Sequence, residues 1–214
     1  MNTSPAHGLV LRSLSAARLA VVAVALVAAP RVWAADNAAG TSSKAQPVVS
    51  TVTVQLQHRT VDLPVDFETF SRNLVSLLGH FNPADVTIAA TDLKRGLERL
   101  QASQGEQGLM LFDGTHSDHG ALFALVGKPV QKSIRYHIGN PLIAIRMEQK
   151  NMGVALYAPL TVLAYELTPG SVRVEYDLPT STFGQFHDPD IDKVAAILDP
   201  KLYALLLKAA GVSN

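Results

Sequence analysis

Apolar and polar residues alternate along the middle of the chain in the pattern of half-buried β-strands. Ile134, Tyr136 and Ile138 alternate with polar neighbours up to Gly139. Similar strands are expected at Leu160 to Glu166 and Val172 to Tyr176, joined by a turn at Pro169-Gly170. An earlier run, Thr51 to Gln57, alternates Val52, Val54 and Leu56 with polar side chains, and Leu109 to Phe112 is a short apolar run typical of a buried strand. The pattern therefore predicts five strands.

Helical spacing of apolar residues follows each of five residues that commonly cap helices, namely Asp66, Asn82, Asn140, Asp188 and Asp199. All except Asp66 are followed by Pro, which is tolerated at the first position of a helix. The helix after Asn82 is expected to run to Ser103, with Gly96 weakening it. A helical turn is expected at Ala121 to Val126, and Thr180 to His187 is interpreted as a loop.

These elements predict an α+β fold, in which an antiparallel sheet of about five strands carries helices on one face. Residues 48–214 contain no linker and no internal repeat, so they are expected to form one domain. Polar side chains would occupy the uncovered face of the sheet, namely Thr53, Gln55, Arg135, His137, Arg173 and Glu175.

The amino-terminal segment has the pattern of a signal peptide. Arg12 and Arg18 precede the uncharged run Leu19 to Ala29, and small residues lead up to Ala34, which predicts cleavage after residue 34. An uncleaved anchor is the alternative, although the run is shorter than the roughly 20 apolar residues that span a bilayer. Residues 35–47 are small and polar and are expected to form a disordered leader. The mature chain is therefore predicted to be periplasmic or secreted, with no transmembrane segment.

Composition narrows the choice of partners. The full chain has 18 basic and 18 acidic residues, and removal of residues 1–34 leaves 15 basic against 18 acidic. No basic patch or stripe occurs, so nucleic acid is not an expected partner. The chain has no cysteine, which excludes disulfides, thiol chemistry and metal sites built on Cys.

The strongest candidate for ligand binding lies where the central strand meets the following helix. The amino end of a helix after Asn140 offers backbone N–H groups and a positive dipole to an anion. Arg135 and His137 on the preceding strand, together with Arg173, could complete a pocket for a carboxylate or phosphate. The alternative is that Asn140 simply caps the helix.

A second candidate is the polar loop from Asp113 to Gly120, which contains His116, Asp118 and His119. Imidazole and carboxylate groups are common ligands of zinc, copper and nickel. A metal site here would need a further ligand, such as His137 or His187. The alternative is that Asp118 caps the helical turn after it while His119 bonds locally.

The central part of the chain resembles the bacterial family called domain of unknown function 302. The resemblance rests on these features: Asp118-His119 after the LMLF strand, Gly139-Asn140-Pro141 and its helix, Ala158-Pro159 before an apolar strand, the V-x-V-x-Y-D run ending at Asp177, and the closing helix Leu202 to Ala210. It extends over residues 105–211, and more loosely over residues 48–80. It implies a compact domain with helices on one side of an antiparallel sheet, frequently a homodimer, and no established activity. The segment Asn82 to Ser103 is an addition to this pattern.

No sequence motif of a hydrolase triad or a phosphate-binding loop occurs. The favoured interpretation is an exported, non-enzymatic module that binds a small anionic or amphipathic ligand through Arg135, His137, Asn140 and Arg173, with no cofactor identified. A metal-dependent protein or enzyme using His116, Asp118 and His119 is one alternative. A structural protein that forms dimers is the other.

Overall fold

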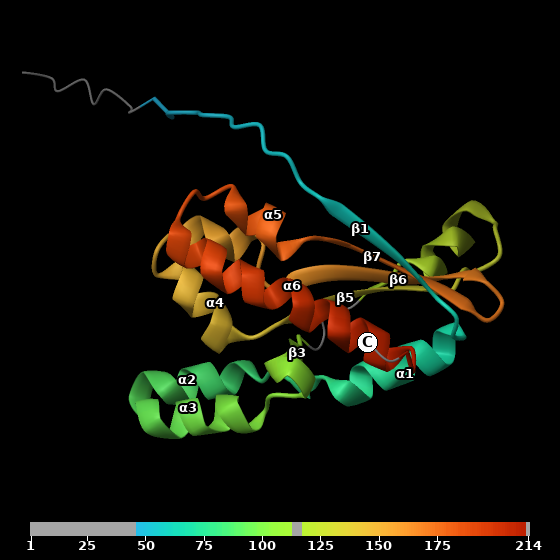
Figure 1. Ribbon diagram of the computed structural model, residues 1–214, viewed down its shortest axis with the longest axis horizontal. Coiled ribbons are helices and arrows are strands. Elements are labelled where there is room, and N and C mark those ends of the chain that lie inside the picture. The colour runs from blue at the N-terminus through green and yellow to red at the C-terminus, as the bar shows by residue number, and fades with distance from the viewer. Residues whose placement is uncertain (1–45, 113–116, 213–214) are drawn as a thin grey trace, which may run out of the picture. The chain divides into compact units, whose positions relative to one another are not determined.

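The computed structural model of the protein describes residues 46–112 and 117–212. Every helix and strand in these ranges lies within the unit Ser50–Asn214 (Figure 1). The expected signal peptide, and all but two residues of the expected leader, lie outside the described residues, so export stays a prediction. None of the described helices is both long and apolar enough to cross a membrane.

One mixed sheet of seven strands organises the described part of the chain. Its order is β1-β7-β6-β5-β3-β2, with β4 paired to β5 off this path. All neighbouring strands are antiparallel except β2 and β3, which are parallel. The bounds are β1 His58–Leu63, β2 Gly79–His80, β3 Met110–Leu111, β4 Ser117–Asp118, β5 Ser133–Gly139, β6 Leu160–Thr168 and β7 Ser171–Asp177.

The expectation of a purely antiparallel sheet of about five strands is therefore corrected. The strands β2 and β4 have two residues each, which is too short to produce an alternating pattern in the sequence. Parallel pairing of β2 with β3 requires a crossover connection, and the helices between Phe81 and Leu109 supply it. The main strands β5, β6 and β7 are confirmed, and Ile138, Val162 and Val174 are completely buried on one face.

The first strand begins later than the sequence predicts. Residues 51–57 form no strand, and β1 starts at His58. The reason lies in β7, which pairs with β1 only as far as Asp177 opposite His58, before the chain turns away into a helix. The last backbone hydrogen bond at this end joins the Leu178 N–H to the Gln57 carbonyl at 2.8 Å. Among the described residues, no strand lies beside the alternating segment upstream of Gln57.

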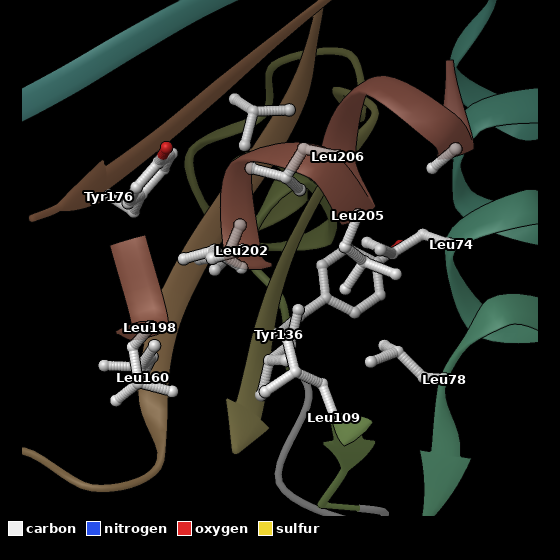
Figure 2. Close-up of a cluster of buried hydrophobic side chains, with 14 of the residues drawn as sticks. Leu74, Leu78, Leu109, Tyr136, Leu160, Tyr176, Leu198, Leu202, Leu205 and Leu206 are labelled. Carbon is white, nitrogen blue, oxygen red and sulfur yellow. The ribbon is translucent and has the colours of Figure 1, made fainter. Parts of the chain in front are cut away.

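Two helices cover the apolar face of the sheet. Helix α1, Phe67–Leu77, is capped by Asp66, which confirms the prediction. Helix α6, Pro189–Ala209, is a single helix, although the sequence predicts two. Figure 2 shows Tyr136 of β5 packed between Leu74 of α1 and Leu205 of α6. Buried apolar side chains from both helices and from the strands form one hydrophobic cluster.

The continuity of α6 through Pro200 follows from its apolar stripe. Ile191, Leu198 and Leu205 mark a buried face that keeps helical spacing on both sides of the proline. Asp199 does not start a new helix, because its carboxylate accepts hydrogen bonds from the N–H and the Oγ1 of Thr180 at 3.1 and 2.6 Å. Those bonds anchor helix α5, Pro179–Gly184, in a segment that the sequence analysis interprets as a loop, so that interpretation is wrong.

The segment expected to be one helix from Asn82 to Ser103 is a hairpin of two helices. They are α2, Pro83–Thr91, and α3, Leu93–Ala102, and Asp92 ends one and caps the other. Gly96 makes the close crossing possible, because an added Cβ would lie 2.3 Å from the Cβ of Ala89. The buried carboxylate of Asp85 forms an ion pair with Arg99, which also ties α2 to α3.

Shorter elements complete the domain. Helix α4, Pro141–Glu148, follows β5 as predicted. In the part of the chain that the structure describes, three segments adopt 3₁₀ geometry, namely η1 Glu106–Gly108, η2 Gly120–Val126 and η3 Met152–Leu156. The helical turn predicted at Ala121 to Val126 corresponds to η2, and Gly127 ends it in the left-handed region at φ 68°.

Substitution of Gly96 by Ala is expected to lower the free energy of unfolding by roughly 1–3 kcal/mol, because the added methyl forces α2 and α3 apart. At an open helical position the same change stabilises by about 1 kcal/mol. Gly184→Ala is the matched control, since nothing lies within 4 Å of its added Cβ. Urea denaturation followed by far-ultraviolet circular dichroism measures both. A Gly96→Ala protein as stable as wild type contradicts the close crossing.

Candidate functional site

Asn140 links the end of β5, the turn before β3 and the first turn of α4. Its side chain is 5% exposed, and its Oδ1 accepts a hydrogen bond from the Leu142 N–H at 2.8 Å. Its Nδ2 donates to the carbonyl of Gly108 at 2.7 Å, which fixes the turn before β3. Both halves of the amide are therefore used within the fold, as burial of a polar side chain requires.

The backbone donors in the first turn of α4 are also occupied. Pro141 has no N–H, and the N–H of Leu142 bonds to the Asn140 side chain. The N–H groups of Ile143 and Ala144 both donate to the carbonyl of Asn140, at 3.0 and 2.9 Å. This arrangement favours the capping interpretation of Asn140 and leaves none of these donors for an anion.

Helix α4, from Pro141 to Glu148, forms one wall of an apolar cavity of about 380 Å³. The opposite wall is the α2–α3 hairpin, and the strand end at Gly139 with the segment Ala158 to Leu160 closes the floor. Among the described residues that line it, Asn140 and Glu148 are the polar ones. The lining residues are Val86, Ala89, Leu97, Leu100, Phe112, Gly139, Asn140, Pro141, Leu142, Ile143, Ala144, Ile145, Met147, Glu148, Ala158, Pro159, Leu160, Phe183 and Leu198.

Stacked aromatic rings hold the base of the hairpin beside the cavity. Phe81, just before α2, stacks on Phe112 with ring centroids 4.4 Å apart and planes inclined by 27°. The N–H of Phe81 also donates to the carbonyl of Leu111 at 3.0 Å. Beyond this base, α2 and α3 pack against each other more extensively than against any other element. The hairpin therefore forms a wall of the cavity without being buried in the main core.

The other three residues predicted to bind a ligand lie on the uncovered face of the sheet. Arg173 forms a two-point ion pair with Asp62, with N···O distances of 2.6 and 2.8 Å. The carboxylate raises the pKa of Arg173, and the guanidinium lowers the pKa of Asp62. Arg135 donates to the Oγ of Ser117 at 3.4 Å, and within the described residues its buried Nε has no hydrogen-bond partner.

Strand β6 separates Arg173 from Arg135 and His137, which lie two residues apart on β5. Strand β6 lies between β5 and β7, so Arg135 is opposite Leu163 and His137 is opposite Thr161. Arg173 is opposite Tyr165, on the far side of β6. Helix α4 packs with α6 on the other face. The four predicted residues thus do not surround one cavity, and ligand binding by Arg135, His137 and Arg173 stays a prediction.

The uncovered face carries a network that the sequence analysis missed. His58 Nδ1 lies 2.9 Å from Asp177 Oδ1, and His58 Nε2 lies 3.2 Å from Glu175 Oε2. Since a carboxylate cannot donate, this geometry suits an imidazolium with a proton on each nitrogen. The Tyr165 hydroxyl donates to Glu175 at 2.6 Å. His58 and Asp177 are 119 residues apart, so only the register of β1 against β7 brings them together.

This network shifts the acidities of its members. The hydrogen bond to Asp177 is the main cause that raises the pKa of His58 above 6.5, with desolvation opposing it and Glu175 adding to it. The pKa of Glu175 is lowered, chiefly by the Tyr165 hydroxyl. Protonated His58 therefore links β1 to β7 through two carboxylates.

The loop proposed as a metal site is only partly described. His116 lies outside the described residues. Asp118 Oδ1 accepts a hydrogen bond from the Ala121 N–H at 3.0 Å, as expected of a capping residue. His119 Nε2 is buried, with no hydrogen-bond partner among the described residues. In residues 46–112 and 117–212, no group of three His, Asp or Glu side chains is placed to hold a metal ion, and the metal hypothesis stays a prediction.

Comparison with known proteins identifies the family. The family model described as domain of unknown function DUF302 matches residues 85–209, more than half of the chain. The chain belongs to the DUF302 family. A search of curated proteins found no match. Among solved structures, an uncharacterized conserved DUF302 protein from Bacillus stearothermophilus matches with a TM-score of 0.50 and 18% identity, over 71% of this chain and 97% of that one.

These matches define the fold and the extent of the DUF302 region. At 18% identity the structural likeness supports a shared fold and transfers no activity. The matched region starts at Asp85 and so includes most of the α2–α3 hairpin, which the sequence analysis treats as an addition. Strand β1 and helix α1 precede the matched region.

The His58 network predicts a pH-dependent contribution to stability. Because the fold raises the pKa of His58, this contribution is complete below about pH 6.5 and is lost as pH rises through the pKa of the folded protein. Asp177→Asn is expected to lower the pKa of His58 towards 6.5, as measured by an NMR titration of the imidazole. Glu98→Gln on α3 removes an equal charge elsewhere and leaves the pKa unchanged. An equal His58 pKa in wild type and Asp177→Asn contradicts the network.

Proposed function

We propose that this DUF302 protein binds a small apolar or amphipathic molecule in the cavity between the α2–α3 hairpin and α4. The cavity itself is the main support for this function. Its volume of about 380 Å³ lies within the range of roughly 300–1,000 Å³ typical of small-molecule sites. The strongly apolar lining supports a ligand whose buried part is hydrocarbon.

The charges around the cavity narrow the class of ligand. The donors in the first turn of α4 are already bonded, which argues against an anionic headgroup beside Asn140. Glu148 is the titratable side chain among the described lining residues. A neutral or cationic polar end near Glu148 therefore suits the site better than a carboxylate or a phosphate.

The lining also supports binding over catalysis. Apart from Glu148, the described lining offers no Ser, His, Lys or other side chain commonly used as a nucleophile or as a general base. A carboxylate alone could position a cationic group, and covalent chemistry would need partners that the described lining does not contain. The favoured function is thus a ligand-binding module, and not an enzyme.

Ala144→Trp is expected to fill the cavity from the α4 side and to weaken binding of N-phenyl-1-naphthylamine, a neutral apolar fluorescent probe, by about tenfold or more. That change corresponds to about 1.4 kcal/mol. Fluorescence titration of the purified protein measures the dissociation constant. Ala90→Trp is the matched control, because Ala90 is exposed on α2 and does not line the cavity.

Circular dichroism must show that both Trp variants keep the wild-type helix content. Absence of probe binding to the wild-type protein contradicts the proposed function. So does equal affinity of the probe for wild type and Ala144→Trp, because the probe would then bind elsewhere.

A further inference from the structure

Another cavity lies between α1 and the covered face of the sheet. Its volume is about 670 Å³. Helix α1 forms one wall, and strands β2, β3 and β5 contribute the other lining residues. Among the described residues, the lining is Ser71, Arg72, Val75, Ser76, Leu78, His80, Leu111, Ile134 and Tyr136. It has no residue in common with the cavity beside α4, so the two cavities are separate.

Two hydroxyl groups in this lining are buried without hydrogen-bond partners. Tyr136 is 2% exposed, and its side chain extends from β5 towards α1 (Figure 2). Within the described ranges, neither its hydroxyl nor the buried Oγ of Ser71 has a partner. Burial is the main cause that raises the pKa of Tyr136, and the Ser71 hydroxyl lowers it, which indicates that the two groups lie close together. Unpaired buried hydroxyls destabilise a fold and are rare unless a ligand or water bonds to them.

Local bonding does not account for the Ser71 hydroxyl. A serine inside a helix commonly bonds to a carbonyl in the preceding turn. Ser76 of the same helix does so, because its hydroxyl donates to the Asn73 carbonyl at 2.7 Å. Ser71 makes no such bond to a described residue, although its Oγ is buried. Its hydroxyl is therefore available to a molecule in the cavity.

The charges of the lining favour a negatively charged acceptor. The described lining contains the guanidinium of Arg72 and no carboxylate. Arg72 donates to the neutral hydroxyl of Thr69 at 3.1 Å. Hydroxyl and guanidinium groups bind carboxylates through charge-assisted hydrogen bonds, which are stronger than neutral ones. Val75, Leu111 and Ile134 add apolar surface on which a hydrocarbon body could be buried.

We propose that this cavity between α1 and the sheet binds a small carboxylic acid with an apolar body, whose carboxylate accepts hydrogen bonds from Ser71 and Tyr136. The ligand would supply the partners that the two buried hydroxyls lack in the chain alone. Arg72, which is exposed, adds positive charge at the edge of the cavity. The site differs in ligand class from the cavity beside α4, where Glu148 favours a neutral or cationic polar end.

An NMR titration of the isotope-labelled full chain with octanoate tests the place and the class of the ligand. Octanoate is expected to shift backbone amides around Ser71 in α1 and Ile134 in β5. Octylammonium, of equal chain length and opposite charge, is expected to bind there roughly tenfold or more weakly, because Arg72 repels it. No octanoate binding, or equal affinity for both molecules at Ser71, overturns the proposal. Shifts concentrated around Ala144 also overturn it, and place octanoate in the cavity beside α4.

Tyr136→Phe separates ligand binding from stability. It is expected to weaken octanoate binding by about tenfold or more, because a hydrogen bond to a charged acceptor is lost. Its melting temperature should equal or exceed that of wild type, since no bond within the described chain is removed. Tyr165→Phe is the matched control, because it removes a hydroxyl that donates to Glu175 on the uncovered face at 2.6 Å, and it should keep the wild-type affinity. Unchanged affinity in Tyr136→Phe, or a clear drop in its melting temperature, overturns the proposal.

Discussion

The side chain of Asn140 is the constraint on which the proposed site depends. It is buried, and a buried amide is stable only when its donor and acceptor are both bonded. Its two hydrogen bonds hold the turn at Gly108 and the first turn of α4 against the end of β5. This bridge fixes where α4 starts, and hence where the wall of the apolar cavity lies. The residue predicted to bind a ligand thus shapes the site, and the nitrogen and the oxygen of its amide are both bonded within the fold.

The α2–α3 hairpin supplies the rest of the site. Its helices are joined by the close crossing at Gly96 and by the ion pair of Asp85 with Arg99, so the hairpin carries its own internal packing. It is attached to the sheet at the stacked rings of Phe81 and Phe112. A hairpin that packs mainly on itself leaves apolar surface facing α4, which creates the cavity. Figure 1 shows the hairpin beside the layer formed by α6 and the sheet.

The sequence predicts the elements whose pattern and caps agree. Strands β5 to β7, helix α1 and helix α4 are confirmed, because alternation or helical spacing coincides with a capping residue or a turn. The prediction fails where a partner that is distant in the sequence determines the local structure. Asp199 looks like a cap for its own helix but binds Thr180, and Thr51–Gln57 alternates like a strand but extends beyond the end of β7.

The candidate site could be predicted only in part, for a related reason. The sequence marks Asn140 as the start of the correct helix, and it is compatible both with a capping role and with anion binding. The cavity, however, depends on the α2–α3 hairpin. The apolar residues on both sides of Asp92 keep the spacing of one continuous helix, so the sequence pattern does not predict the turn there. Likewise, Arg173 and His58 acquire their partners Asp62 and Asp177 through strand register, which a single sequence does not encode locally.

The most direct test of the proposed ligand site is an NMR titration of the isotope-labelled protein with N-phenyl-1-naphthylamine, following the backbone amides. A ligand in the cavity is expected to cause shifts concentrated in α2, α3 and α4, at residues around Val86, Leu97 and Ala144. Amides on the uncovered face of the sheet, around His58, Arg135 and Arg173, should remain unchanged. Shifts confined to that face, or no shifts at all, would contradict a ligand site between the hairpin and α4.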